Sequence, residues 1–244
     1  MAEITYAKLS GNIREKGFVF SSSCTVYGVP DKIPVKETAP IKPAFSTYGY
    51  TKQVGERVLT DFFKKKPKSS LTLLRYFNPI GAHPSGLIGE LPIGVPRNLV
   101  PYITQTGVGK RKKLTVFGKD YDTDDGTCVR DYIHVVDLAN AHVASLKKGL
   151  NSSESIKIYN VGTGKGCSVM DVVAAFEKVS DQKLNYEFGP RREGDVPEIY
   201  SDNELIKNKL GWDVKFSLED CLEHSWKWEK NLVNFKYKSE KKQD

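Results

Sequence analysis

Tyr48 and Lys52 form the pair of residues in this sequence whose chemistry is easiest to specify. A tyrosine and a lysine four residues apart lie on the same face of a helix, one turn from each other. The ammonium of Lys52 favours the phenolate form of Tyr48, and such a tyrosine accepts a proton from a sugar or alcohol hydroxyl near neutral pH. Ser23 closes a run of three serines after an apolar segment, where its hydroxyl can hydrogen-bond the same substrate group. These three residues predict a proton-transfer site.

A second group of polar residues lies later in the chain and comprises Asn78, Arg130, Arg192 and Asp195. A guanidinium pairs bidentately with pyrophosphate oxygens, and a carboxylate suits the hydroxyls of a ribose. Each of these residues, taken alone, is explained equally well by a surface ion pair, just as an isolated Y-x-x-x-K pattern is usually two residues that share an exposed helix. The interpretation as a nucleotide site therefore depends on the blocks occurring together.

Strands and helices alternate along the chain, which predicts an α/β fold that positions these residues. Short apolar runs predict buried strands over 17–21, 71–77 and 156–161, with further extended segments over 113–118, 131–135 and 186–188. Helices are predicted over 47–65, 98–108, 136–146, 169–180, 203–210 and 218–231. The first helix would have an apolar face formed by Val54, Val58, Leu59, Phe62 and Phe63, and Pro67 would end it.

Several familiar motifs are excluded by their spacing. The glycines 162, 164 and 166 do not fit the dinucleotide pattern G-x-G-x-x-G, and we interpret them as a strand-to-helix turn. The four histidines lack metal-ligand spacing, and we expect His134 and His142 to be packing or capping residues. The four cysteines form no C-x-x-C pair, so we expect neither a metal site nor a disulfide framework.

The bulk composition suits a protein of the reducing cytosol. The 244 residues are 39% hydrophobic, which is enough for a sizeable core. The net charge of +7 comes from scattered or short basic runs, which we assign to solvated loops rather than to nucleic-acid binding, and it suits an anionic nucleotide substrate. Neither a signal peptide nor a membrane span is predicted, so we expect a cytoplasmic protein that contacts no membrane.

Six blocks of the sequence, taken in order, resemble the UDP-glucose 4-epimerase family of extended short-chain dehydrogenases/reductases. They are residues 18–28, 48–52, 74–86, 126–139, 159–164 and 191–195, and the likeness extends over roughly 17–230. The resemblance implies the C-terminal part of a Rossmann-like parallel sheet plus a smaller α/β substrate-binding domain. It also implies an isomerase of galactose metabolism that interconverts UDP-glucose and UDP-galactose through an NAD-bound 4-keto intermediate.

The resemblance assigns roles to the candidate residues. Tyr48 would be the catalytic base, Lys52 would tune it and bind the nicotinamide ribose, and Ser23 would assist proton transfer. These three residues and Phe77 would contact NAD. Together with Ser23 and Tyr48, the UDP-sugar would be held by Asn78, Asn98, Leu99, Thr115, Val116, Phe117, Arg130, Arg192 and Asp195. A homodimer is implied, and no metal.

The resemblance also predicts how the chain is divided. Residues 1–16 match nothing in the family, 17–77 form a partial NAD-binding Rossmann domain with interleaved later segments, 78–232 mainly bind the UDP-sugar, and 233–244 are a disordered basic tail. The family's N-terminal G-x-x-G-x-x-G turn, which cradles the NAD pyrophosphate at a helix N-terminus, is not found before Ser23. We therefore expect this chain alone to bind NAD poorly and to epimerise little.

Two other functions remain open. The chain is alternatively a non-catalytic UDP-sugar-binding remnant or a partner subunit of a fuller chain. A related NAD-dependent sugar-nucleotide enzyme, such as a 4,6-dehydratase or a decarboxylase, ranks last, because a dehydratase would carry acidic residues beside the catalytic serine and Cys24-Thr25 offers none. Arg97 stands where the family usually has asparagine, and Ile199 at the hexose-limiting position leaves the acceptance of N-acetylated sugars open.

Overall fold

The computed structural model describes residues 17–66, 68–149 and 155–240, so the expectations for residues 1–16 and 241–244 lie outside the described residues. The chain forms two compact units, which are described one at a time. The first comprises Met1–Phe77, Leu138–Lys165 and Ile199–Val214, and the second comprises Asn78–Asp137, Gly166–Glu198 and Lys215–Asp244. The partition expected from the sequence also changes at residue 77, while the assignment of each part to a ligand stays a prediction.

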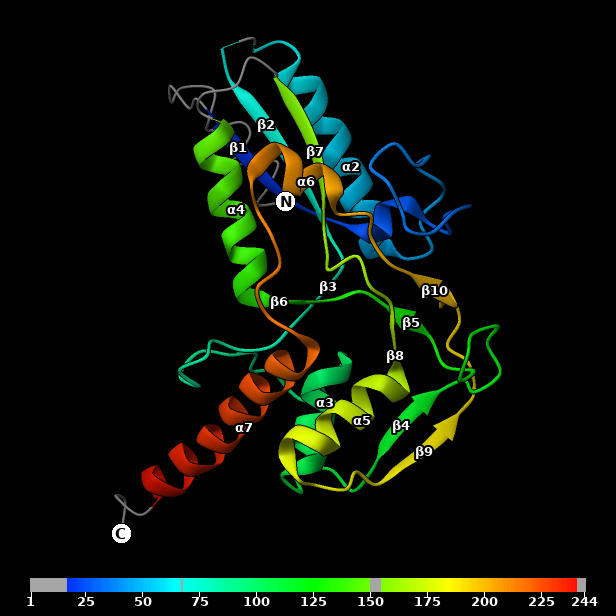
Figure 1. The fold of residues 1–244 in the computed structure, drawn as a ribbon, viewed down its shortest axis with the longest axis vertical. Helices are drawn as coiled ribbons and strands as arrows, with labels where there is room; N and C mark the ends of the chain where they lie inside the picture. The colour runs from blue at the N-terminus through cyan, green and yellow to red at the C-terminus, as the bar shows by residue number, and fades with distance from the viewer. Residues whose placement is uncertain (1–16, 67, 150–154, 241–244) are drawn as a thin grey trace. The chain divides into compact units, whose positions relative to one another are not determined.

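The first unit is built on a parallel sheet of three strands in the order β1-β2-β7 (Figure 1). The strands are β1 (Gly17–Ser23), β2 (Ser70–Tyr76) and β7 (Ile156–Val161), where the apolar runs predicted them. Adjacent residues of a strand point to opposite faces of the sheet. Ser21 contacts His142 of α4 (Val135–Gly149) at 2.8 Å, whereas Ser22 donates to Glu56 of α2 (Thr47–Phe63) at 2.5 Å. The two helices therefore cover opposite faces.

The sheet face under α2 changes from apolar to polar along the strands. The strand register places Phe20, Leu73 and Ile158 side by side in one row across the sheet. Phe20 and Leu73 are buried there with Leu59 and Phe63 of α2. The next row on the same face, toward the carboxyl ends of the strands, is Ser22, Arg75 and Asn160, and all three are buried. Polar residues thus lie at the edge where parallel α/β sheets bind their ligands.

Local features of the sequence fix where α2 begins and how closely it packs. The Ser46 side chain caps the helix by accepting the backbone N–H of Gly49 at 3.0 Å. Gly55 allows a close approach to the sheet, because a Cβ at this position would lie 2.6 Å from Cζ of Phe20. The helix ends at Phe63, ahead of Pro67, where the sequence predicted its end near residue 65.

The predicted apolar face of α2 is wrong at one position. Leu59 and Phe63 are buried, but Val58 is 40% exposed. Glu56, a charged residue that the hydrophobic pattern placed outside the core, is buried instead, because it pairs with a polar residue of the sheet rather than with an apolar one.

Shorter elements complete the first unit. A 3₁₀ helix, η2 (Cys24–Tyr27), follows β1 directly, and α6 (Glu204–Leu210) lies near the C-terminal part of the unit. The long loop after η2 is held by a backbone bridge, in which Val35 donates to the carbonyl of Tyr200 at 2.9 Å and accepts from Asp202 at 2.8 Å. The loop that follows Ser23 is therefore fixed to the body of its unit.

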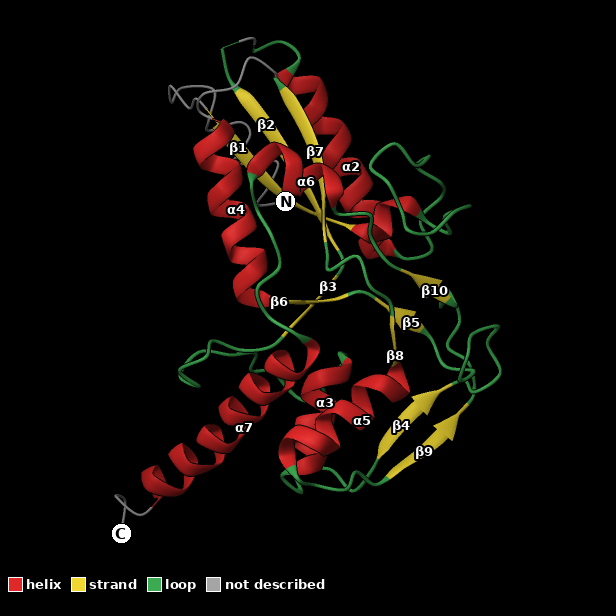
Figure 2. Cartoon of the chain, in the orientation of Figure 1, coloured by secondary structure: helices red, strands yellow, loops and turns green. Residues whose placement is uncertain are grey.

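The second unit consists of three helices and several short strands (Figure 2). The helices are α3 (Leu99–Gly107), α5 (Val169–Ser180) and α7 (Leu218–Glu240). The strand pairs are β3 (Asn78–Ile80) with β6 (Tyr132–His134), β4 (Leu114–Phe117) with β9 (Tyr186–Gly189), and β5 (Val129–Arg130) with β8 (Cys167–Ser168). β10 (Glu198–Ile199) is the neighbour of β5 on its other side. Ile103, Val116, Phe176, Leu222 and Trp226 lie in the core of this unit.

Polar side chains bind backbone N–H groups at the starts of two helices. Ser168 and Asp171 form a reciprocal capping box on α5, in the turn that follows the glycines 162–166. His134 precedes α4 and accepts the backbone N–H of Val136 through Nδ1 at 3.0 Å, while His142 packs on Ser21. Both histidines are therefore packing or capping residues, as expected.

The structure corrects the expected C-terminus and adds short strands. α7 extends to Glu240, past the predicted end at 231, so residues 233–240 of the expected disordered tail are helical. The segment contains no proline or glycine to end the helix. The sequence did not predict β3, β5, β8 or β10, which have two or three residues each.

Candidate functional site

The first unit brings Tyr48 and Lys52 together in the first turns of α2. The ammonium of Lys52 lies 5.6 Å from the centroid of the Tyr48 ring and 5.1 Å from that of Phe20. It donates to the backbone carbonyl of Ser21 at 2.9 Å, which ties the lysine to β1. Tyr48 is 49% exposed. The spacing of the two residues therefore produced the predicted contact.

Ser23 is the last residue of β1 and is buried. Its Oγ accepts the backbone N–H of Thr25 at 3.3 Å and the hydroxyl of Thr25 at 3.0 Å. A serine hydroxyl has two acceptor positions and one O–H donor. Thr25 of η2 occupies both acceptor positions. The O–H of Ser23 can therefore donate a hydrogen bond to an oxygen of a ligand.

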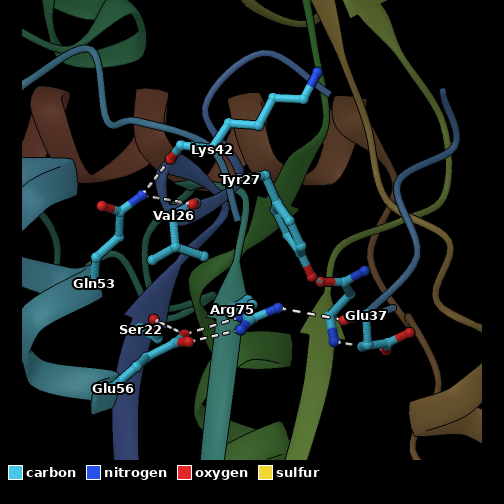
Figure 3. Close-up of polar contacts among 9 residues, drawn as sticks. Ser22, Val26, Tyr27, Glu37, Lys42, Gln53, Glu56 and Arg75 are labelled. Carbon is cyan, nitrogen blue, oxygen red and sulfur yellow. Dashed lines mark hydrogen bonds and ion pairs between the residues drawn. The ribbon is translucent and has the colours of Figure 1, made fainter. Parts of the chain in front are cut away.

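A buried ion pair docks α2 on the sheet (Figure 3). Nε and Nη2 of Arg75 donate to the two carboxylate oxygens of Glu56 at 2.9 Å and 2.6 Å, and Ser22 donates to the same carboxylate. Burial alone lowers the pKa of the Arg75 guanidinium, but its hydrogen bonds to Glu56 reverse this and raise its pKa. The helix that carries Tyr48 and Lys52 is thereby fixed in position on the strand that carries Ser23.

Asn160 extends this polar row to β7. Its Oδ1 accepts the hydroxyl of Tyr27 at 2.7 Å, and its backbone N–H donates to Glu37 at 2.8 Å. Burial raises the pKa of Tyr27 to about 12 and also raises the pKa of the Glu37 carboxyl. The Arg75 guanidinium lies 4.8 Å from the centre of the Tyr27 ring. The polar row therefore contacts the segment that follows Ser23 at two positions, Tyr27 and Glu37.

Gln53 holds the same segment from α2. Its Nε2 donates to the backbone carbonyl of Val26 at 2.9 Å and to that of Lys42 at 2.7 Å (Figure 3). Gln53 is next to Lys52 in sequence, so these bonds fix η2 and the following loop beside Tyr48 and Lys52.

Phe77, the residue that the resemblance places at NAD, follows β2. It is buried and donates its backbone N–H to the carbonyl of Val161 at 3.1 Å.

The second unit contains a cavity of about 850 Å³. Among the residues that line it are all nine that the resemblance assigned to the UDP-sugar besides Ser23 and Tyr48: Asn78, Asn98, Leu99, Thr115, Val116, Phe117, Arg130, Arg192 and Asp195. These residues come from β3, the start of α3, β4, β5 and the loop after β9. Ser23, Tyr48, Lys52 and Phe77 belong to the first unit and do not line this cavity.

The charged residues of the cavity have separate partners. The guanidinium of Arg192 lies 4.4 Å from the centre of the Phe117 ring. Arg130 is 3.7 Å from Asp195 and donates to the carbonyl of Val129 at 2.9 Å. Arg191 does not line the cavity, and it pairs with Asp120 instead. The block 191–195 therefore contributes one guanidinium and one carboxylate to the cavity rather than a continuous cluster.

Several cavity residues were not predicted as site residues. Ile93, Val95, Arg97, Tyr102 and Cys128 also line it. Burial raises the pKa of the Cys128 thiol. The sequence identified Arg97 only as a departure from the family pattern. An apolar residue such as Ile93 or Val95 looks the same in sequence whether it lines a cavity or lies in an exposed loop.

The described part of the chain contains neither a metal-binding cluster nor a membrane-spanning helix. Within residues 17–66, 68–149 and 155–240, no three His, Cys, Asp or Glu side chains are grouped so that they could hold a metal ion. No helix of the same residues is long and apolar enough to cross a membrane.

The sequence matches one family model over most of its length. The model is described as GDP-mannose 4,6 dehydratase and matches residues 4–225. A UDP-glucose 4-epimerase of Bacillus subtilis (strain 168) is 52% identical over 219 residues, which are 90% of this chain and 64% of the relative. One of Haemophilus influenzae is 51% identical over 88% of this chain and 63% of the relative. The chain thus spans less than two thirds of the length of these relatives.

Solved structures of similar proteins have the same fold. A UDP-glucose 4-epimerase from Bifidobacterium longum in complex with NAD+ and UDP has a TM-score of 0.91 and 42% identity, and the match covers 96% of this chain and 69% of that one. A UDP-glucose-4-epimerase from Stenotrophomonas maltophila, with bound NAD and formylated UDP-arabinopyranose, also has a TM-score of 0.91 and 42% identity, with 95% and 68% covered.

Proposed function

Because the chain belongs to the family of the UDP-glucose 4-epimerases, we propose that it provides the sugar-nucleotide site and the proton-transfer residues for interconverting UDP-glucose and UDP-galactose. The observation that carries the proposal is that nine residues assigned to the substrate line one cavity. Its volume of about 850 Å³ falls in the range of pockets that enclose small molecules.

The cavity offers the groups that a nucleoside diphosphate sugar requires. Arg130 and Arg192 supply guanidinium donors for the diphosphate, where charge-assisted hydrogen bonds are strongest. Asp195 supplies an acceptor for sugar or ribose hydroxyls. The Phe117 ring, which the Arg192 guanidinium contacts at 4.4 Å from its centre, supplies an aromatic surface for the nucleotide base. The remaining cavity residues add amide groups and apolar surface, so the site combines few charges with a mostly uncharged wall.

Tyr48, Lys52 and Ser23 account for the proton steps. Tyr48 is the base that takes the proton of the sugar 4-hydroxyl, and the Lys52 ammonium lies 5.6 Å from the centre of its ring. The O–H of Ser23 donates a hydrogen bond to the same sugar oxygen, because its acceptor positions are used by Thr25. Tyr48 then returns the proton to the oxygen of the 4-keto sugar.

When bound, NAD would supply hydride transfer to and from C4 of the sugar. Tyr48, Lys52 and Phe77 would hold the nicotinamide riboside end of NAD, since Tyr48 is about half exposed and the Lys52 ammonium lies beside its ring. The 244 residues contain no G-x-x-G-x-x-G turn to fit the pyrophosphate. We therefore propose that this chain by itself binds the UDP-sugar well and NAD weakly.

A second candidate function is UDP-sugar binding without catalysis, either alone or as the partner of a fuller subunit. It is favoured by the observation that residues of the second unit by themselves form the cavity. Family likeness also suggests a homodimer, which sedimentation of the purified chain tests directly.

Calorimetric titration of the purified chain with UDP tests the proposal. Arg192→Ala should weaken binding at least tenfold, as expected for a charge-assisted hydrogen bond. Arg191→Ala is the matched control, because the neighbouring arginine does not line the cavity, and it should stay within about twofold. Absence of UDP binding by the wild-type chain would refute the proposal.

Turnover of UDP-galactose with added NAD separates the two candidate functions. Measurable conversion to UDP-glucose that Tyr48→Phe abolishes establishes the epimerase. UDP binding without turnover, even at saturating NAD, establishes the binding protein. Assaying released NAD(H) after denaturing the purified chain tests the expected weak cofactor binding.

A further inference from the structure

One wall of the cavity is a loop that α7 holds by its backbone. The loop lies between β3 and α3, and its residues Ile93, Val95 and Arg97 line the cavity. Three side chains of α7 donate to its backbone carbonyls. Lys227 donates to Pro84 at 2.8 Å, Asn231 donates to Gly86 at 2.7 Å, and Trp228 donates through Nε1 to Glu90 at 2.9 Å.

The loop backbone packs tightly against the indole ring of Trp228. A Cβ on Gly89 would lie 2.4 Å from the indole ring, so only glycine allows the loop to pass this near. The indole N–H is directed at the carbonyl of the next residue, Glu90. The position of Glu90 relative to α7 is therefore fixed both by packing and by a hydrogen bond.

The Glu90 side chain in turn holds Asn98, one of the residues assigned to the substrate. Nδ2 of Asn98 donates to a carboxylate oxygen of Glu90 at 2.9 Å. A carboxylate only accepts hydrogen bonds, so this contact fixes which end of the Asn98 amide is the nitrogen. Asn98 is also the N-cap residue of α3, where asparagine usually accepts a backbone N–H, yet its side chain makes no cap hydrogen bond.

We propose that Glu90, held in place by Trp228, is a positioning residue for the sugar-nucleotide site. It keeps the Asn98 amide away from the cap of α3, with its nitrogen fixed on Glu90 and its oxygen free to accept from a ligand hydroxyl. It acts through Asn98 and does not itself line the cavity. The proposal rests on the proposed UDP-sugar site, because Asn98 is given its role there.

Titration of the full chain with UDP-glucose tests this role. Glu90→Ala should weaken binding three- to tenfold, which corresponds to the loss of about one net hydrogen bond. Glu90→Gln retains an acceptor oxygen and should stay within about twofold of wild type. Trp228→Phe keeps an aromatic ring but removes the N–H that donates to the carbonyl of Glu90, so it should also weaken binding of UDP-glucose. Glu223→Ala removes an equal charge from an exposed position of α7 and is the matched control.

A double-mutant cycle distinguishes positioning from a general structural effect. Glu90→Ala should have no further effect on affinity in a chain that already carries Asn98→Ala. Thermal unfolding midpoints of the Glu90 variants should match that of wild type. Additive losses in the double variant, or unchanged affinity in Glu90→Ala, would overturn the proposal while leaving the UDP-sugar site intact.

A measurement without ligand separates this proposal from the proposed function. In the NMR spectrum of the nitrogen-15-labelled chain, Glu90→Ala should shift the side-chain amide signals of Asn98, and Glu90→Gln should shift them less. An unchanged Asn98 signal contradicts the positioning role whether or not UDP-glucose binds. A shifted signal in a chain that binds no UDP-glucose supports the contact between the two side chains and refutes the proposed function.

Discussion

Removing the Glu56 carboxylate should be among the most destabilising single changes in the first unit. Glu56→Ala leaves the Arg75 guanidinium, which is 4% exposed, without its two carboxylate hydrogen bonds. It also removes the acceptor of the Ser22 hydroxyl. Breaking one partner of a buried ion pair typically costs about 3–5 kcal/mol, because the remaining charge stays buried without compensation.

The cost should depend on the unpaired charge and not on the loss of side-chain volume. The double variant Glu56→Ala, Arg75→Leu removes both charges and should recover part of the stability lost by Glu56→Ala alone. Asp61→Ala is the control on the same helix, since the Asp61–Lys64 pair is more than half exposed on both sides. An exposed pair of this kind is worth less than about 1 kcal/mol.

Urea unfolding at neutral pH, followed by circular dichroism, measures these differences. Because the chain has two compact units, hydrogen exchange of the backbone amides in β1 and α2 should accompany it, so that unfolding of the first unit is observed separately. Stability of Glu56→Ala within about 1 kcal/mol of wild type would refute the reasoning, as would a cost for Asp61→Ala of similar size.

Three further outcomes are expected from individual residues. Burial lowers the pKa of His134 to about 4, so the folded state resists its protonation; stability should fall by up to about 3 kcal/mol as the pH drops from about 6.5 to 4, and unfolding of His134→Gln measured across this range should show a smaller loss. Gly55→Ala should cost about 1–3 kcal/mol, because its Cβ would lie 2.6 Å from Phe20, and a wild-type urea midpoint would show that α2 can move away. Ser168→Ala should destabilise the chain by about 1 kcal/mol through loss of the α5 capping box, and restoration by Ser168→Thr checks that the hydroxyl is responsible.

The sequence predicted long elements well because their patterns are long. The helix over 169–180 and the strand over 156–161 were predicted with the bounds that the structure shows. β5 and β8 were missed, since two residues carry no periodicity to read. Their pairing is set by contacts between segments that are far apart in the sequence.

The error on α2 has a different cause. A hydrophobic pattern assigns an apolar residue such as Val58 to the core and a charged residue such as Glu56 to the solvent. Burial of Glu56 depends on Arg75, which lies on another element and shows no sequence signal of its partner. A buried ion pair is therefore visible only once the strand register is known.

Only part of the candidate site could be predicted from residue types and spacing. The contact between Tyr48 and Lys52 follows from helical spacing and was predictable from residue types alone. The family resemblance assigned all nine cavity residues, and only Asn78, Arg130, Arg192 and Asp195 had also been selected by the chemistry of their side chains. Glu90 and Trp228 were not identified at all, because their connection to Asn98 runs through a backbone carbonyl and a loop.

The position of the Glu56–Arg75 ion pair on α2 affects the fate of chains in which this helix is out of register. One helix carries Tyr48, Lys52 and the docking carboxylate of Glu56. A slip of one residue along the helix axis would move Tyr48 by about 1.5 Å, and a misplacement of about 1 Å is enough to lower a reaction rate roughly a hundredfold. The same slip would bring Glu56 away from Arg75 and leave both charges buried without a partner. Chains in which α2 is misaligned should therefore unfold and be degraded, rather than accumulate as folded protein with a displaced Tyr48.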